Sequence, residues 1–295
     1  MRNSLFVCNT YSDSISIIDV DMFEEIHRIN LNLSHSHRMG PHGICAYKDN
    51  LLIANNYSNS LSIVNIKEGK IINDFFVGMN CNDVKVCGDL AYVICGDSNK
   101  IIRYNLKKNQ IEEQISCEDM PHSIDLCKQK QIMVTANMNS DSITVADYGK
   151  DNGVRHIRVG NYPTKAVFSI DGKDIYICES NIGSDQCGSI SIVSSKDFRI
   201  LYRIPVGNTP VDMCIEQNLC FVSNFGDGTI SVVDLNKCTE LKRVEIGGMP
   251  RGILKYKGNV YVGDNYNSLI FCINIEENSR KKILIGREPS GMLLS

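Results

Sequence analysis

The chain has 295 residues, of which 31 are Lys or Arg and 34 are Asp or Glu, so its net charge is -3. Such a chain has no basic field for holding a phosphate backbone, and we expect no nucleic-acid partner. Residues 1–20 lack the apolar core of a signal peptide, and no window approaches the length of a membrane span. A cytoplasmic protein without a membrane partner is therefore expected.

A segment of the form Pro-x-x-hydrophobic recurs along the chain with a period of about forty residues, which is typical of a repeat architecture. The segments begin at Pro41, Cys81, Pro121, Pro163, Pro210, Pro250 and Pro289. At Cys81 the proline is lost, although the rest of the unit is kept.

Each segment opens a unit that continues with a hydrophobic run, a serine-rich run and a last run ending in a Val-Gly or Ile-Gly turn. The serine-rich runs include "SISIID" (14–19), "SLSIVN" (60–65), "SITVAD" (142–147), "SISIVS" (189–194) and "TISVVD" (229–234). Alternation with period two indicates strands, and Gly, Asn or Asp at the breaks indicates hairpins. Four short antiparallel strands in a unit of about forty residues form the blade of a β-propeller.

The sequences at the two ends of the chain together make up one repeat unit. The chain starts with the second run of a unit, near Phe6, and finishes with a lone first segment, "PSGMLLS" (289–295). The pattern predicts an all-β fold, a seven-bladed β-propeller of four-stranded antiparallel blades. Its last blade combines residues 1–35 with the C-terminal strand as the innermost strand. We expect a single domain, 1–295, and a monomer.

Four short stretches carry a family resemblance: Phe221-Val222-Ser223-Asn224, Ile230-Ser231-Val232-Val233-Asp234, Ile246-Gly247 and Pro250-Arg251-Gly252. The units resemble the YVTN-repeat, or YncE-like, propellers. The resemblance covers the whole chain and implies the fold. It implies little about activity, because the motif residues are architectural and the fold hosts unrelated functions.

In such a blade the first strand starts, and the second strand ends, on the same face of the disc, so loops from all blades converge there. The residues that follow the proline position are His42, Asn82, His122, Thr164, Val211, Arg251 and Ser290. The residues that end the second run are Asn9, Asn55, Cys95, Asn137, Glu179, Asn224 and Asp264. These two rings contain most candidate ligand-binding residues.

The asparagines of the second ring, Asn9, Asn55, Asn137 and Asn224, have two interpretations. Asparagine bonds local backbone and suits turns, so its recurrence is explained by architecture; alternatively the amides face a ligand. Glu179 and Asp264 replace the amide by a carboxylate, and we expect them to face a ring that contains His42, His122 and Arg251.

Histidine is scarce, with six residues in the chain, and four of them are His35, His37, His42 and His122. Imidazoles that converge with a carboxylate such as Glu179 would bind one transition metal ion. In the alternative interpretation His35 and His37 lie in a solvated loop, while His42 and His122 are polar channel groups bonded to water.

Two further features break the repeat. The loop "ESNIGSDQCGS" (179–189) is lengthened; it is either a specificity loop, with Asp185, Gln186 and Cys187 as its expected contact residues, or tolerated drift of the sequence. Thirteen cysteines occur singly with no C-x-x-C pair, which predicts reduced thiols acting as small core residues. Cys95, in the Asn ring, and Cys187 are the two that this interpretation explains least.

Two functional hypotheses remain. The first is a non-catalytic binding or scaffold protein that holds a small anionic ligand or a partner peptide around His42, His122, Lys165, Glu179 and Arg251. The alternative is a metal-assisted enzyme, a lactonase-like hydrolase or an oxidoreductase, which uses the histidines and Glu179. A structural role in an assembly is also compatible with the sequence. Whether the histidines meet separates the first two hypotheses.

Overall fold

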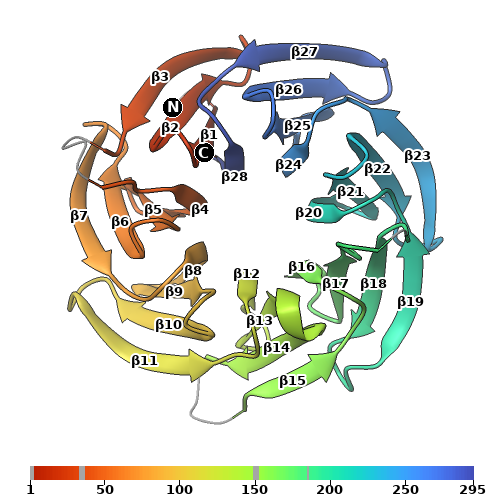
Figure 1. Cartoon of the computed structure of the whole chain (residues 1–295), viewed down its shortest axis with the longest axis horizontal. Coiled ribbons are helices and arrows are strands. Elements are labelled where there is room, and N and C mark those ends of the chain that lie inside the picture. Colours follow the sequence, from red (N-terminus) through yellow and green to blue (C-terminus); the bar gives the residue numbers. More distant parts are fainter. Residues whose placement is uncertain (1–2, 33–36, 149–152, 185) are drawn as a thin grey trace.

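The computed structural model describes residues 3–32, 37–148, 153–184 and 186–295. Within these residues the chain forms seven four-stranded antiparallel sheets that surround a central channel (Figure 1). This arrangement confirms the predicted all-β, seven-bladed β-propeller. We number the blades 1 to 7 in the chain order of their innermost strands, starting at Pro41.

In blades 1 to 6 the strands run in chain order from the channel outward. Blade 1 contains β4 (Pro41–Tyr47), β5 (Asn50–Asn55), β6 (Ser60–Asn65) and β7 (Lys70–Phe76). Blade 2 contains β8 (Cys81–Cys87), β9 (Leu90–Cys95), β10 (Lys100–Asn105) and β11 (Gln110–Ser116). Blade 3 contains β12 (Pro121–Cys127), β13 (Ile132–Asn137), β14 (Ser142–Asp147) and β15 (Arg155–Arg158).

The second half of the ring repeats this order. Blade 4 contains β16 (Pro163–Phe168), β17 (Asp174–Glu179), β18 (Ser189–Ser194) and β19 (Ile200–Pro205). Blade 5 contains β20 (Pro210–Glu216), β21 (Leu219–Asn224), β22 (Thr229–Asp234) and β23 (Thr239–Glu245). Blade 6 contains β24 (Pro250–Tyr256), β25 (Asn259–Asp264), β26 (Leu269–Asn274) and β27 (Ser279–Leu284).

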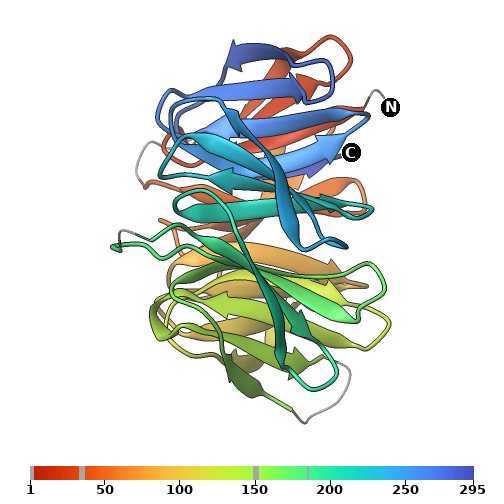
Figure 2. The same cartoon turned by 90° about the vertical axis from the view of Figure 1, so that its right-hand side faces the viewer.

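Blade 7 closes the ring with both ends of the chain. It contains β28 (Pro289–Leu294), β1 (Ser4–Asn9), β2 (Ser14–Asp19) and β3 (Glu24–Asn30), in this order from the channel outward. β28 pairs antiparallel with β1. Ser4 and Ser295 exchange backbone hydrogen bonds at 2.9 and 3.0 Å, so the two ends of the described chain lie close together (Figures 1 and 2). The predicted closure is therefore confirmed, and it leaves neither β1 nor β28 as a free sheet edge.

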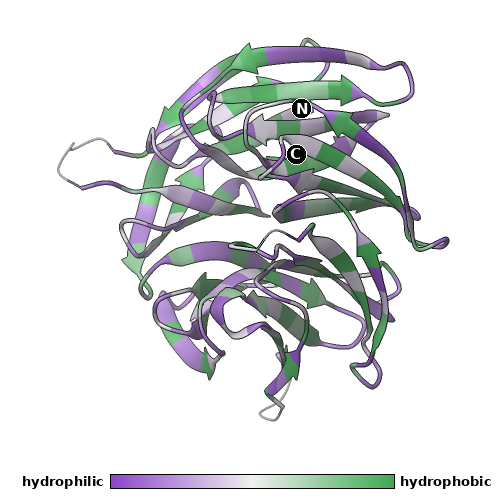
Figure 3. Cartoon of the chain, turned by 45° about the vertical axis from the view of Figure 1, so that its right-hand side comes forward, coloured by the Kyte–Doolittle hydropathy of each residue, from purple (hydrophilic) through white to green (hydrophobic). Residues whose placement is uncertain are grey.

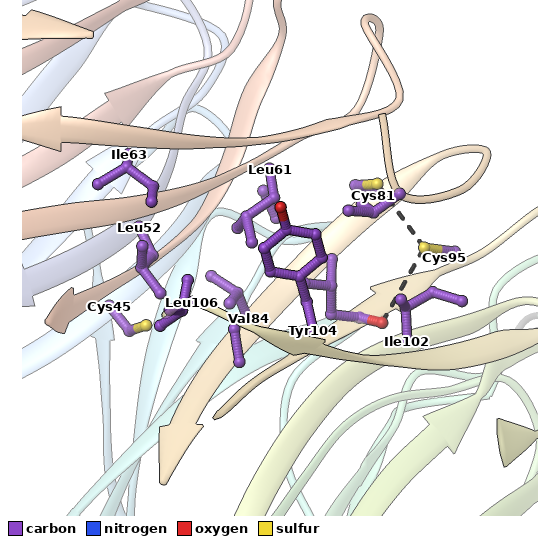
Figure 4. Packing of buried hydrophobic residues seen from close by; sticks show 14 residues of the cluster. Cys45, Leu52, Leu61, Ile63, Cys81, Val84, Cys95, Ile102, Tyr104 and Leu106 are labelled. Carbon is purple, nitrogen blue, oxygen red and sulfur yellow. Dashed lines mark hydrogen bonds between the residues drawn. The ribbon is translucent and has the colours of Figure 1, made fainter. Parts of the chain in front are cut away.

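The hydrophobic core lies between neighbouring blades, so both faces of most sheets are buried. In β5 every residue after Asn50 is buried, whereas most of the outer strand β7 is exposed. Apolar and polar residues alternate along many strands (Figure 3). Figure 4 shows one of the clusters, in which Leu52 and Leu61 of blade 1 pack against Val84 and Tyr104 of blade 2.

The described part of the chain contains one helical element, the single 3-10 turn η1 (Met138–Ser140). No helix there is long and apolar enough to cross a membrane.

Candidate functional site

A β-bulge at the start of each inner strand leaves the residue after the proline position unpaired, and in six blades this residue lines the channel. In blade 1, Pro41 pairs with Asn55 and Gly43 pairs with Ala54, so His42 between them has no partner. The same shift of register occurs in all blades, directly after the proline position. Bulges re-aim side chains. Six of the residues that follow the proline position line a channel cavity of about 130 Å³: His42, Asn82, His122, Val211, Arg251 and Ser290.

The next position along each inner strand makes the channel asymmetric. A Cβ on Gly291 would lie 2.3 Å from the backbone oxygen of His42, and one on Gly43 would lie 2.5 Å from the Cα of Asp83. Glycine is needed at these two positions because neighbouring inner strands approach too closely for a side chain. Other blades carry Asp83, Ser123, Lys165 and Asp212 at the equivalent position, and all four line the cavity.

Two histidines and an arginine from three blades meet at the top of this cavity. The rings of His42 and His122 lie 5.4 Å apart in an edge-to-face arrangement. His42 Nδ1 donates to the backbone oxygen of Asn82 at 2.7 Å, so its Nε2 carries the lone pair that accepts Arg251 Nη2 at 2.8 Å. His122 Nδ1 donates to the backbone oxygen of Thr164 at 3.0 Å. The hydrogen bonds thus fix His42 in the neutral Nδ1–H form, and they place a proton on Nδ1 of His122.

Burial and positive charge act on these groups in the same direction. Burial lowers the pKa of His42 well below its ordinary value, and the charge of Arg251 lowers it further. Burial, followed by Arg251, lowers the pKa of His122 to about 4. Burial also lowers the pKa of Arg251, but a guanidinium stays protonated in proteins. At neutral pH the cluster therefore has two neutral imidazoles beside one positive charge.

Below this cluster Lys165 lies between two carboxylates from other blades. Its Nζ is 3.2 Å from Asp212 Oδ1 and 3.9 Å from Asp83 Oδ2. Burial alone would lower the pKa of Lys165, but the charges of Asp212 and Asp83 outweigh it and raise the pKa. Both carboxylates also accept backbone N–H groups of a neighbouring inner strand, from Ile124 and Ile253. The charge of Lys165 is thus balanced inside the channel.

A second cavity of about 290 Å³ opens above the channel. His42, His122 and Arg251 line both this upper cavity and the channel cavity below. They form a boundary layer between the two, which we call the channel mouth. Tyr57 and Glu288 are among the residues that line the upper cavity.

The four asparagines of the second ring lie inside the blades. Asn9, Asn55, Asn137 and Asn224 are fully buried. Each donates through Nδ2 to two hydroxyl groups of the third strand, at 2.6 to 3.1 Å. None of the four lines the channel cavity or the upper cavity. We call this arrangement the Asn clasp, and it matches the architectural interpretation of these residues.

Glu179 and Asp264 occupy the clasp position of their blades. Glu179 accepts the N–H of Gly160 at 2.7 Å and the hydroxyls of Ser189 and Ser191 at 2.7 and 2.6 Å, and Arg203 lies 3.3 Å away. Asp264 accepts three backbone N–H groups, from Met249, Tyr266 and Asn267.

The structure therefore turns both carboxylates into the blade framework. Within the described residues they make no contact with His42, His122 or Arg251. The physical reason is that the side chain at the end of the second strand meets donors inside its own blade: hydroxyl groups of the third strand for Glu179, and N–H groups of adjacent loops and turns for both carboxylates.

The histidines predicted as metal ligands are not brought together as a set. His37 lines a separate surface groove with Arg38 and Tyr57, away from the channel cavity, and His35 lies outside the described residues. Among the residues that the structure describes, no group of three or more His, Cys, Asp or Glu side chains could hold a metal ion. Of the predicted histidines that the structure describes, His42 and His122 meet, and the guanidinium of Arg251 accompanies them.

The lengthened loop of blade 4 and the cysteines complete the sequence candidates. Gln186 and Cys187 are exposed and line neither cavity of the mouth, and Asp185 lies outside the described residues. All the cysteines are free thiols. Most are buried or partly buried among apolar side chains, as the sequence predicts. Cys95 is buried and contacts a second thiol, Cys81, at 3.7 Å.

Sequence reasoning missed Asp83 and Asp212. Both stand two residues after the proline position, where blades 1, 6 and 7 have glycine. The replacement of a small residue by an aspartate in two blades is a signal of the same kind as the other departures from the repeat.

No family model matches the chain, and no curated protein matches it. Among solved structures, a functionally unknown protein from Desulfotomaculum acetoxidans is similar with a TM-score of 0.83 and 14% identity, over 99% of this chain and 98% of that one. Virginiamycin B lyase from Staphylococcus aureus has a TM-score of 0.72 and 17% identity, over 86% of this chain and 88% of that one. Kuenenia stuttgartiensis hydrazine synthase has a TM-score of 0.74 and 16% identity, over 96% and 92%. At these identities the likeness shows the fold alone.

Proposed function

We propose that the protein is a non-catalytic binding protein that holds a small anion, a carboxylate or a phosphate, at the channel mouth. The observation that carries the proposal is the state of Arg251. This guanidinium is partly buried, and its hydrogen bond is to the neutral His42 ring. Within the described residues no carboxylate forms an ion pair with it, in contrast to Lys165 deeper in the channel.

Asp212 and Glu288 attract the guanidinium of Arg251 only at longer range, which raises its pKa against the effect of burial. A partly buried charge without a paired carboxylate is costly, and a bound anion offsets that cost. A guanidinium presents several N–H donors in a planar fork that matches carboxylate and phosphate oxygens. Because one of these donors is used by His42, the others are available to a ligand. The carboxylates of Asp83 and Asp212 lie deeper in the channel and repel an anion there, and Glu288 lines the upper cavity. We therefore place the ligand directly against the guanidinium of Arg251 at the mouth.

The size of the space sets the size of the ligand. The channel cavity of about 130 Å³ accommodates several water molecules or one small group. The upper cavity gives additional room above the mouth. The fitting ligands are therefore small anions, or one anionic group of a larger molecule such as the carboxylate of a peptide side chain.

Isothermal titration calorimetry with inorganic phosphate and with citrate tests this proposal. Wild-type protein is expected to bind at least one of the two anions, and Arg251→Gln is expected to lose at least tenfold in affinity. Arg280→Gln, which removes an exposed arginine of the outer strand β27, is the matched control and should bind as the wild type does. Absence of binding by the wild type, or equal binding by Arg251→Gln, would refute the proposal.

A metal-assisted enzyme is the second candidate, and the contact between His42 and His122 is the observation that favours it. Two features weigh against it. Both ring nitrogens of His42 already make hydrogen bonds, and Arg251 repels a cation beside them. The resemblance of the repeats to the YVTN-repeat group supports neither candidate over the other. The cytoplasmic location, the monomeric state and the absence of nucleic-acid and membrane partners stay predictions.

A further inference from the structure

Blade 2 departs from the repeat at two positions that lie opposite each other. In the other blades the proline that begins the inner strand pairs with the residue that ends the second strand. These pairs are Pro41 with Asn55, Pro121 with Asn137, Pro163 with Glu179, Pro210 with Asn224, Pro250 with Asp264, and Pro289 with Asn9. In blade 2 the same register pairs Cys81 with Cys95. Both positions hold cysteine in this blade and in no other.

The two thiols are in contact. Their Sγ atoms lie 3.7 Å apart, and both side chains are fully buried (Figure 4). Cys81 Sγ also donates to the backbone oxygen of Gly78 at 3.1 Å. Directly opposite residues of an antiparallel pair have Cβ atoms about 4.5–5.5 Å apart, close to the spacing that a disulfide needs. Formation of the bond requires the sulfurs to approach from 3.7 Å to about 2.05 Å.

The Asn clasp is also missing from blade 2. The positions that carry its two hydroxyl groups in other blades are occupied here by Lys100 and Ile102. Cys95 therefore has no hydroxyl partner on the third strand; its sulfur contacts the sulfur of Cys81 at 3.7 Å and the backbone oxygen of Val93 at 4.0 Å. The end of β9 lacks the polar clasp that four other blades have.

We propose that Cys81 and Cys95 form a redox-sensitive thiol pair, which a peroxide converts into an intramolecular disulfide between β8 and β9. This inference is independent of anion binding at the mouth.

The chemistry balances with one hydrogen peroxide per pair. One thiol loses its proton, and the resulting thiolate attacks a peroxide oxygen. The O–O bond breaks, hydroxide leaves and takes up that proton as water, and the cysteine becomes a sulfenic acid. The second sulfur then displaces the sulfenic oxygen as water, which breaks the S–O bond and forms the S–S bond. Overall, two thiols and one peroxide give one disulfide and two water molecules; the sulfurs are oxidised and the peroxide oxygens are reduced.

The environment of the pair sets the rate. The hydrogen bond with Cys95, followed by burial, raises the pKa of Cys81, so the thiolate is scarce at neutral pH. We therefore expect a slow reaction that becomes faster as the pH rises. Only a small oxidant such as a peroxide can reach a pair that is fully buried.

The position of the pair connects it to the channel mouth. Asn82 follows Cys81 directly, and its backbone oxygen accepts the Nδ1–H of His42. Its side-chain oxygen accepts Asn56 Nδ2 at 2.7 Å. We therefore expect a movement of Cys81 during disulfide formation to shift Asn82, the residue whose backbone oxygen holds His42 in place.

Disulfide mapping by mass spectrometry tests the proposal. Wild-type protein is treated with hydrogen peroxide, unfolded in the presence of iodoacetamide, and digested. We expect a Cys81–Cys95 linked peptide at least tenfold more abundant than any other cysteine pair, and its loss after treatment with dithiothreitol. Cys81→Ser and Cys95→Ala should each abolish the linked peptide, whereas Cys8→Ala, which removes another fully buried thiol, should leave it unchanged.

The exposed Cys187 provides an internal measure of oxidation. If peroxide fully oxidises Cys187 while Cys81 and Cys95 are both recovered as alkylated thiols at neutral and at alkaline pH, the pair is only a packing feature and the proposal is wrong. The same conclusion follows if Cys81 is linked mainly to a cysteine other than Cys95. Wild-type protein alone decides both outcomes, so the test does not depend on the folding of a variant.

Discussion

The low pKa of His122 makes the stability of the protein depend on pH in a specific way. In the unfolded chain an imidazole takes up its proton near its ordinary pKa of about 6.5, whereas in the folded protein His122 does so at about 4. Between these values the unfolded state binds more protons, so stability is lost as the pH falls through this window. At about 1.4 kcal/mol per pH unit, the full loss from this one group is about 3 kcal/mol.

The variant His122→Gln isolates this contribution. The glutamine amide can still donate to the backbone oxygen of Thr164, which His122 bonds at 3.0 Å, but it does not titrate. Denaturant unfolding of wild type and variant at pH 7 and at about pH 4.5 gives the four free energies needed. We expect the wild type to lose about 2–3 kcal/mol more than the variant over this interval. Acid effects of other groups cancel in the comparison.

Two further measurements check that the pH dependence comes from His122. The Cε1–H resonance of His122, assigned by its absence in the variant, should titrate with a midpoint near 4. His156→Gln, which removes an imidazole from the outer strand β15, is measured beside His122→Gln as the matched His→Gln replacement away from the channel. If wild type and His122→Gln lose the same free energy on acidification, or if the resonance titrates near 6.5, the reasoning from burial and Arg251 is refuted.

Three other predictions concern the framework and the metal hypothesis. Asn137→Ala removes an Asn clasp and should lower the free energy of unfolding by about 1–3 kcal/mol. The control Asn236→Ala, which replaces an exposed asparagine, should change the free energy of unfolding little. Equal effects of the two variants in denaturant unfolding would contradict a stabilising role of the clasp. Deletion of residues 289–295 removes β28 and should lower the Tm by roughly 10 °C or more or prevent folding; an unchanged melting curve would show that closure contributes no stability. Elemental mass spectrometry of untagged protein should find no stoichiometric transition metal, and a metal that disappears in the double variant His42→Ala/His122→Ala would make the enzyme the leading candidate.

Most of the fold could be predicted from the sequence because the information is local and repeated. Proline at the start of an inner strand and Asn at the end of the second recur at matching places, and the structure pairs them directly, as with Pro41 and Asn55. A single short strand is hard to predict from its sequence, but the same pattern in several units makes the prediction of each strand firmer. The closure of β28 on β1 followed from the fragments left at the two ends.

The site was predicted only in part. His42, His122 and Arg251 were identified because they follow the proline position, and they do meet. Glu179 and Asp264 were expected beside them, but the direction of a strand end turns their carboxylates into the blades. Asp83 and Asp212 were missed because their position carries glycine in three blades, which concealed its access to the channel.

The sequence by itself determined the repeat, the strands of each blade and the two rings of side chains on one face, since periodicity and turn residues act over short distances. Only the tertiary structure decided which members of the rings touch. His42 and Arg251 are 209 residues apart in the sequence. The two carboxylates beside Lys165, of Asp83 and Asp212, belong to two other blades. Such contacts depend on the width of the channel and on the direction in which each bulge points. Both are properties of the closed ring, and a single blade does not contain them.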